Sequence, residues 1–226
     1  MSRCLSSAPG IVIAIDGPSG SGKSSVSREV ARRLGLHYLD TGAMYRALTW
    51  WVSEQAIDLS DHSRLAEAAR TFPLELSLDP DERHVRVGGT DVTEDIRGEV
   101  VTSAVSAVAA DPGVRRGLIE TQRRLMDDSR VNGTGIVAEG RDITTVVARD
   151  ADVRVLLTAS AAERQRRRLA EAGEATARTM AARDAADAKV NEFMTAAPGV
   201  SLVDTTSLGF DEVVEEVLRL VDAARE

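Results

Sequence analysis

The segment from Ile11 to Gly35, IVIAIDGPSGSGKSSVSREVARRLG, joins a run of apolar residues, a glycine-rich turn and an amphipathic stretch without interruption. Residues 11–15 are all apolar and rich in β-branched side chains, which predicts a central parallel strand covered by helices on both faces. After the glycines, apolar residues recur at helical spacing until Gly35 ends the pattern. This order of strand, turn and helix is typical of a loop that holds phosphates.

The remaining sequence alternates between strand and helix patterns. Short buried strands are expected at 37–39, 135–138, 153–158 and 201–206, and helices at 41–55, 97–109, 114–126, 160–190 and 213–221. Such alternation predicts an α/β fold of three layers, in which helices cover both faces of a parallel sheet. Residues 72–93 instead alternate around a polar turn at 79–82, which predicts a β-hairpin. Two parts thus lie outside the sheet, an insertion of about 40–110 and an arginine-rich helical hairpin at about 161–190, with a break expected at Ala172–Gly173.

Composition limits the classes of function. A chain of 226 residues with 43% hydrophobic and 28% charged residues is expected to form a globular main domain with insertions. It has no apolar run of roughly 18 residues and no secretory signal, so we expect a cytoplasmic protein that does not bind a membrane. The net charge of -8 and pI near 5.1 argue against nucleic-acid binding through the whole surface. Cys4 is the single cysteine, and the three histidines lack metal-ligand spacing.

The glycine-rich turn matches the pattern G-x-x-x-x-G-K-[ST] at every fixed position. Its residues are Gly17, Pro18, Ser19, Gly20, Ser21, Gly22, Lys23 and Ser24. Glycines let successive N–H groups point at phosphate oxygens, Lys23 can reach the β- and γ-phosphates, and the Ser24 hydroxyl can ligate Mg²⁺. The pattern predicts nucleotide binding, but it does not by itself distinguish a kinase from a switch.

Arginines near the ends of predicted strands point to a second, phosphorylated substrate. They comprise Arg46 in LDTGAMYR, Arg141 in AEGRD, and the set Arg164, Arg167, Arg168, Arg178 and Arg183. Thr41 and Tyr45 lie close enough to Arg46 in sequence to occupy neighbouring faces of one helix. Glu139, Arg141 and Asp142 follow a buried strand, so we expect them near Lys23 at the carboxyl edge of the sheet.

Several motifs together resemble the bacterial cytidylate kinases of the P-loop nucleoside monophosphate kinase family. They are IDGPSGSGKSSVSR, LDTGAMYRAL, TDVTEDIR, VSAVAADPGVRRGLIETQR, AEGRDITTVV and ERQRRR followed by ARD, and they cover nearly the whole chain from Ile11 onward. The resemblance implies a P-loop core (11–39, 111–160 and 191–226), a monophosphate-binding insertion (40–110) and a mobile lid (161–190), after a flexible leader (1–10). It also implies a monomer that transfers a phosphoryl group from ATP to CMP or dCMP with Mg²⁺.

The resemblance further implies roles for residues in the matching motifs. ATP would be bound by the whole glycine-rich turn with Ser25 and Arg164. CMP would be bound by Thr41, Tyr45, Arg46, Ser106, Arg115, Arg141, Asp142, Arg183 and Asp187. The residues implied to act in transfer are Lys23, Arg46, Arg141 and Arg183, and Ser24 would bind the metal with Glu139 acting through water. Asp16 is a second, less favoured carboxylate for this task.

Base chemistry supports cytosine independently. Cytosine has an N4 amino donor where uracil has an acceptor, so Asp142 can accept from cytosine, while Arg115 and Ser106 can donate to N3 and O2. Two departures from the family pattern stand out: Thr144 replaces the usual glycine of GRDIGTVV, and Val190 replaces an arginine of the lid. We expect the first to alter a close backbone approach and the second to weaken a phosphate clamp, for which Lys189 supplies only a point charge.

Three alternatives remain open on the sequence. The chain could be a P-loop kinase of another small acceptor, such as UMP, shikimate or a sugar acid. It could instead be a catalytically impaired nucleotide-binding protein, or a structural protein that binds RNA through the basic helix at 164–168. The acidic charge and the lack of interleaved aromatic residues oppose the last of these.

Overall fold

The computed structural model describes residues 10–170 and 195–226. Five parallel strands form the central sheet in the order β2-β6-β1-β7-β8. They are β1 (Val12–Asp16), β2 (His37–Asp40), β6 (Ile136–Gly140), β7 (Val153–Thr158) and β8 (Ser201–Asp204). All five strands expected from the sequence are present, and the predicted α/β fold is confirmed. In the register of the sheet, Asp16 lies opposite Gly140 and Asp40 opposite Glu139.

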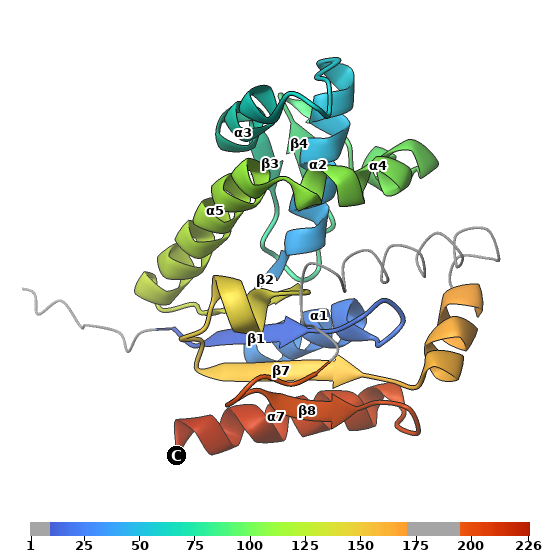
Figure 1. Ribbon diagram of the computed structural model, residues 1–226. Helices are drawn as coiled ribbons and strands as arrows, with labels where there is room; N and C mark the ends of the chain where they lie inside the picture. Colours follow the sequence, from blue (N-terminus) through green and yellow to red (C-terminus); the bar gives the residue numbers. More distant parts are fainter. Residues whose placement is uncertain (1–9, 171–194) are drawn as a thin grey trace, which may run out of the picture.

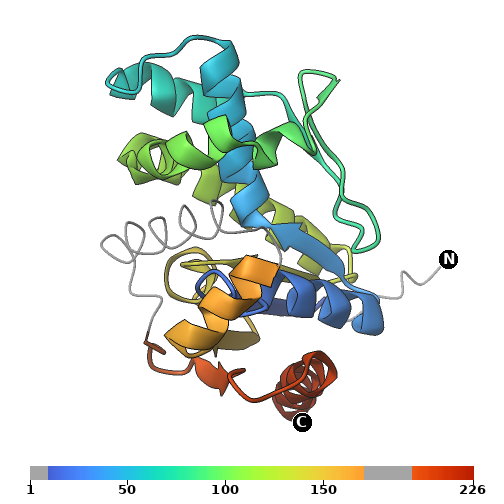
Figure 2. The ribbon, with the colours of Figure 1, turned by 90° about the vertical axis from the view of Figure 1, so that its right-hand side faces the viewer.

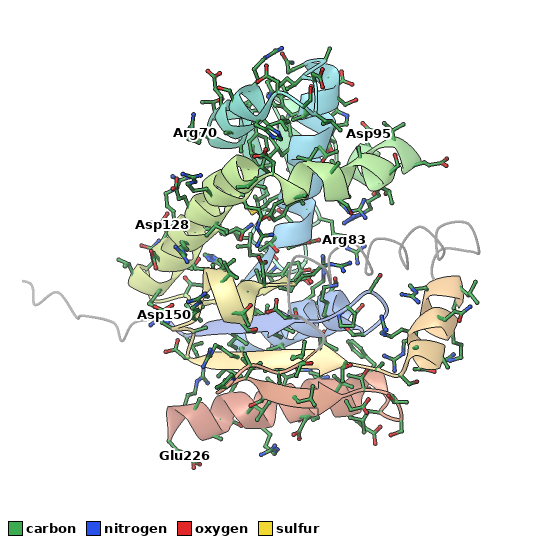
Figure 3. The ribbon with its side chains drawn as sticks, in the orientation of Figure 1. Arg70, Arg83, Asp95, Asp128, Asp150 and Glu226 are labelled. Carbon is green, nitrogen blue, oxygen red and sulfur yellow. The ribbon has the colours of Figure 1, made fainter. Side chains whose placement is uncertain are left out.

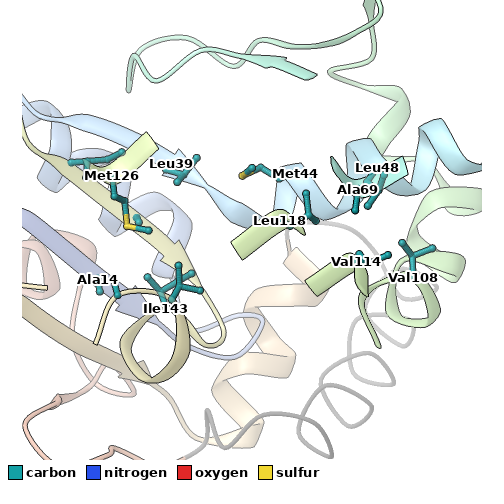
Figure 4. Close-up of a cluster of buried hydrophobic side chains, with 14 of the residues drawn as sticks. Ala14, Leu39, Met44, Leu48, Ala69, Val108, Val114, Leu118, Met126 and Ile143 are labelled. Atoms are coloured by element: carbon teal, nitrogen blue, oxygen red, sulfur yellow. The ribbon is translucent and has the colours of Figure 1, made fainter. Parts of the chain in front are cut away.

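Helices cover both faces of this sheet, because its strands are apolar on both sides. Ile13 and Ile15 pack on one face against α1 (Lys23–Leu34) and α7 (Phe210–Arg225), which contact each other; α7 lies at the bottom of Figure 1. Val12 and Ala14 face the other side, which is covered by α2 (Thr41–Glu54), α5 (Pro112–Val131) and the π-helical turn η2 (Ile143–Val147). Figure 4 shows this second cluster, with Ile143 beside Ala14.

The insertion rises from the carboxyl end of β2. It contains α2, α3 (His62–Thr71), β3 (Leu74–Leu76), β4 (Val85–Val87), β5 (Thr90–Asp91), the short turn η1 (Asp95–Arg97) and α4 (Glu99–Ala110). The predicted hairpin is confirmed as β3 and β4, to which β5 adds a third antiparallel strand. Helix α3 was not expected, because its buried face consists of Leu65 and the small residues Ala68 and Ala69.

The tip of the hairpin returns to the core and contacts it (Figure 2). The backbone N–H of Tyr38 on β2 donates to the carbonyl of Leu78 at 2.8 Å. On the neighbouring helix α1, the Arg32 guanidinium donates to the Asp81 carboxylate at 2.7 Å. The insertion is therefore joined to the core by its hairpin tip as well as by its two chain crossings.

Helix α5 connects the insertion to the core. Near its start, a Cβ on Gly117 would lie 3.2 Å from the Cβ of Ala69 on α3. Further along, Met126 packs in the cluster on the Ala14 face of the sheet. The boundary at 110/111 therefore stays a prediction, as do the other domain limits. In Figure 3, Arg70 and Asp95 mark the insertion, and Asp150 and Glu226 mark the core.

The predicted lid is described only at its start. Residues 161–170 are helical, in agreement with the expected helix. The expected break at Ala172–Gly173, together with Arg178, Arg183, Asp187, Lys189 and Val190, lies outside the described residues, as do Cys4 and the leader up to residue 9. In the part of the chain that the structure describes, each helix is too short or too polar to span a membrane.

Candidate nucleotide site

The glycine-rich loop lies between β1 and α1 at the carboxyl edge of the sheet. Gly20 and Gly22 have φ angles of +79° and +87°, in the left-handed region that side chains disfavour. A Cβ on Gly20 would also lie 2.7 Å from the carbonyl oxygen of Arg164. Helix α1 begins at Lys23, so the positive end of its dipole faces the loop. This backbone suits an anion-binding turn, and the binding of ATP phosphates by the loop stays a prediction.

A buried carboxylate meets the end of this loop. Glu139 on β6 is 3% exposed, and its Oε1 accepts a hydrogen bond from the Ser24 hydroxyl at 2.6 Å. Its Oε2 lies 3.8 Å from Nζ of Lys23, and the Tyr38 hydroxyl donates to Oε1 at 3.2 Å. Burial raises the pKa of Glu139, while the Lys23 ammonium opposes this change. Lys23, Ser24 and Glu139, selected from separate motifs, thus occupy one site.

The donor atoms beside Lys23 suit a hard divalent cation. Mg²⁺ prefers oxygen ligands and keeps several of its waters, so one hydroxyl and one carboxylate are a fitting protein contribution. Ser24 and Glu139 supply these two oxygens. Within residues 10–170 and 195–226, no three His, Cys, Asp or Glu side chains converge as a ready-made metal site. The protein groups therefore fit a cation that is held largely by nucleotide phosphates and water.

The carboxylate of Asp16 faces away from this pair of oxygens. It is 2% exposed and accepts hydrogen bonds from the backbone N–H of Ile143 at 2.9 Å and of Thr144 at 2.8 Å. The Thr144 hydroxyl donates a third, at 2.6 Å. Burial raises the pKa of Asp16 to about 6, although these bonds favour the charged form. The side chain of Thr144 thus adds a bond to that of its backbone N–H, and an altered backbone approach relative to the family stays a prediction.

A second part of the candidate site is an ion pair between α5 and the segment that follows β6. The Arg115 guanidinium on α5 donates to the Asp142 carboxylate at 2.5 Å, and Asp142 is 6% exposed. Burial raises the pKa of the Tyr45 hydroxyl, and the neighbouring charge of Asp142 adds to this effect. The Thr41 hydroxyl at the start of α2 donates to the carbonyl of Glu139 at 2.8 Å. Tyr45, Arg115 and Asp142 are therefore neighbours. All three were predicted to bind the molecule that accepts the phosphoryl group.

Arg46 has partners within the insertion. Its guanidinium donates to the Thr102 hydroxyl on α4 at 2.9 Å and to the carbonyl of Ile96 at 3.1 Å. Ser106 lies one helical turn beyond Thr102 and is partly buried, so it shares that face of α4. Arg141 follows β6 directly and is also partly buried. Arg46 thus joins α2 to α4 through Thr102, on the insertion side of the site.

Arg167 connects the start of the lid to the loop, and its individual role was not predicted. It donates to the Thr205 hydroxyl at 2.9 Å, to the Thr205 carbonyl at 2.7 Å and to the Gly20 carbonyl at 3.5 Å. Thr205 is fully buried and donates to the carbonyl of Ser21 at 3.2 Å. Thr205 follows β8 at the carboxyl edge of the sheet, and this position is the signal that could have identified Thr205 as a residue of the site. Tyr38 was also missed, because its sequence context resembles ordinary packing.

Comparison with known proteins gives a consistent result. The family model described as cytidylate kinase matches residues 13–223. A cytidylate kinase of Streptomyces avermitilis is 45% identical over 223 residues, which is 96% of this chain and 95% of that one. One of Rhodococcus opacus is 47% identical over 221 residues, covering 93% and 94%. The solved structure of TT1252 from Thermus thermophilus has a TM-score of 0.48 at 23% identity, covering 95% and 97%.

Proposed function

The chain belongs to the cytidylate kinase family, and on this basis we propose that it transfers the γ-phosphoryl group of ATP to CMP or dCMP with Mg²⁺. The products are ADP and CDP or dCDP. The observation that carries the proposal is the Arg115–Asp142 pair beside Tyr45, which lies at the same edge of the sheet as the phosphate loop. The proposed site at that edge has two halves. The donor half binds ATP, the phosphoryl donor, and the acceptor half binds CMP or dCMP, the phosphoryl acceptor.

The donor half is assigned to the loop residues 17–24 with Ser25 and Arg164. Backbone N–H groups of the loop bind the phosphates of ATP, and Lys23 balances their charge. Ser24 and Glu139 would hold Mg²⁺, which supplies charge neutralisation at the phosphates when it is bound. The ion-pair distance of 3.8 Å between Lys23 and Glu139 leaves the ammonium free to turn toward a phosphate.

The acceptor half is assigned to residues from α2, α4, α5 and the end of β6. Asp142 accepts from the cytosine N4 amino group, and Arg115 and Ser106 donate to N3 and O2. Uracil would place an oxygen against the Asp142 carboxylate and lose that hydrogen bond. The remaining residues bind the monophosphate and its surroundings; they are Thr41, Tyr45, Arg46 and Arg141, with Arg183 and Asp187 from the lid.

The proposed transfer is direct and in line, without a covalent enzyme intermediate. Lys23, Arg46, Arg141 and Arg183 distribute the negative charge of the transition state, since phosphoryl transfer depends mainly on positioning and electrostatics. Closure of the lid (161–190) over the core and the monophosphate-binding insertion (40–110) excludes water. We also propose a monomer that works in the cytoplasm.

One assay separates this function from the alternatives. ADP release is measured with ATP and Mg²⁺ in the presence of CMP, dCMP, UMP, AMP or no acceptor. We expect the fastest release with CMP or dCMP and little release without an acceptor. Preference for UMP would support a kinase of another acceptor, whereas ATP binding without acceptor-dependent release would support a catalytically impaired protein.

A further inference from the structure

Asp16 and Thr144 connect the two halves of the site. Asp16 is the last residue of β1, directly before the phosphate loop. Thr144 is the second residue of η2, and this turn directly follows Arg141 and Asp142. The two side chains are each 2% exposed and share the 2.6 Å hydrogen bond. A residue at the entrance of the donor loop therefore holds the segment that carries two acceptor residues.

Other contacts make η2 a rigid support for this segment. The carbonyl of Asp142 accepts from the N–H groups of Val146 at 2.8 Å and Val147 at 3.1 Å, so the turn begins at the proposed cytosine ligand. At its other end, Arg123 of α5 donates to the carbonyls of Val146 at 2.8 Å and Val147 at 2.9 Å. The turn is thus held at both ends, by Asp16 and by Arg123.

We infer that Asp16 and Thr144 form a positioning pair that sets the placement of Asp142 and Arg141 relative to the phosphate loop. Neither side chain is assigned a contact with substrate, so they act through the residues that they hold. The inference rests on the proposed function, because it takes Asp142 and Arg141 as ligands of the acceptor. It assigns the Thr144 hydroxyl a role that a glycine, with only a backbone N–H, could not fill.

The geometry leads us to expect a large effect of one hydroxyl. A hydrogen bond to a buried ion is stronger than one between neutral groups, and its removal leaves the carboxylate with two donors instead of three. The Asp16 carboxylate then becomes free to tilt, and the start of η2 moves with it. Small misplacements of a binding group reduce catalysis strongly, because the reacting atoms must be aligned to within a fraction of an ångström.

The experiment compares two substitutions in the full chain. Thr144→Val removes the hydroxyl and keeps the branched shape, whereas Thr144→Ser keeps the hydroxyl. For Thr144→Val we expect roughly a tenfold rise in the KM for CMP and in the Kd for CMP measured by calorimetry without ATP, since a bond to a charged group is lost. The KM for ATP should stay within about twofold of the unmodified protein, and Thr144→Ser should restore most of the CMP affinity.

The matched control is Thr49→Val. Thr49 is also 2% exposed, but its hydroxyl donates within its own helix, to the carbonyl of Tyr45 at 2.8 Å. It reports the general effect of losing a buried threonine hydroxyl. A Thr144→Val protein whose CMP affinity matches that of Thr49→Val, or whose KM rises equally for both nucleotides, would overturn the inference.

A double-mutant cycle with Asp16→Asn tests the pair itself. We expect Thr144→Val to change the CMP affinity less in the Asp16→Asn background than in the unmodified protein, since their shared hydrogen bond is already altered. Fully additive effects would contradict a positioning pair. If the valine variant does not fold, Thr144→Ala takes its place in the same comparisons. Failure of the unmodified protein to phosphorylate CMP would contradict the proposed function instead, so the two failures are distinguishable.

Discussion

At the scale of single residues, Lys23 is the group whose loss should be most damaging. It begins α1 at the end of the loop and lies 3.8 Å from Glu139, where it can turn to the transferred phosphoryl group. We expect Lys23→Ala to lower kcat by at least about a hundredfold, since one lost electrostatic donor typically costs this much. Arg70→Ala, on the exposed outer face of α3, is the control and should leave the rate unchanged. Near-normal CDP formation by Lys23→Ala would refute the mechanism.

Asp142 should determine which base is accepted. We expect Asp142→Ala to lower kcat/KM for CMP by roughly one hundredfold without lowering that for UMP, because only cytosine donates to the carboxylate. The ratio of the two kcat/KM values, measured in one assay, checks this expectation. Asp150→Ala, an exposed carboxylate elsewhere on the core, is the control. An unchanged ratio in Asp142→Ala would move the base site elsewhere.

Asp16 makes stability depend on pH. Its pKa is raised from 3.8 to about 6, so the carboxylate binds its proton more tightly in the folded protein than in the unfolded chain. Its contribution to stability is therefore fully present below about pH 4 and is lost as the pH rises through about 6. We expect the free energy of unfolding, relative to that of Asp16→Asn, to fall by about 2 kcal/mol between pH 4 and pH 7. Denaturant titrations at several pH values give the free energy of unfolding of both proteins. A difference between the two that does not change with pH would contradict this expectation.

At the scale of elements, a side-chain cap fixes where α5, the helix that connects the insertion to the core, begins. The Asp111 carboxylate accepts from the N–H groups of Gly113 at 2.8 Å and Val114 at 2.9 Å, and Pro112 begins α5. Three residues further along, Arg115 projects toward Asp142, so this cap also fixes the start of the acceptor half.

Removal of that cap should therefore be visible in stability. We expect Asp111→Ala to destabilise the protein by about 1–2 kcal/mol, because two N–H groups at a buried helix end lose their acceptor. Thermal or urea unfolding measures the difference. Asp58→Ala serves as the comparison, since its carboxylate accepts from Ser60 in an exposed turn. Equal losses of stability in the two variants would show that the Asp111 cap contributes no more than the hydrogen bonds of an exposed turn.

At the scale of the whole molecule, Arg167 joins three regions that are distant in sequence. It links the start of the lid, the phosphate loop at Gly20 and the segment after β8 at Thr205. Because all of these contacts are on the donor half, we expect Arg167→Ala to raise the KM for ATP by about tenfold and to change the KM for CMP little. The adjacent Arg166, whose side chain is 71% exposed and bonds Glu163, provides the control as Arg166→Ala. Equal effects of the two substitutions would contradict a specific role for Arg167.

Much of this molecule follows from sequence pattern. The five strands, the phosphate loop and the hairpin were predicted because each produces a local signal, namely apolar runs, fixed glycines or alternation around a polar turn. Helix α3 was missed because alanines carry little apolar signal, and η2 because a π turn has no recognisable pattern. The contact of the hairpin tip with α1 joins residues about 50 positions apart, and no local signal reports it.

The sequence by itself determined the chemistry of the chain: which groups can hold phosphate, a cation and an amino-bearing base, and the order of strand and helix that carries them. Only the tertiary structure decided which neighbours each buried carboxylate contacts. Asp16 is the last residue of β1, Glu139 is the last but one of the neighbouring strand β6, and both are buried carboxylates. The structure turns Glu139 to Lys23 and Ser24, and Asp16 to Thr144, because side chains alternate across a strand and each position meets a different neighbour.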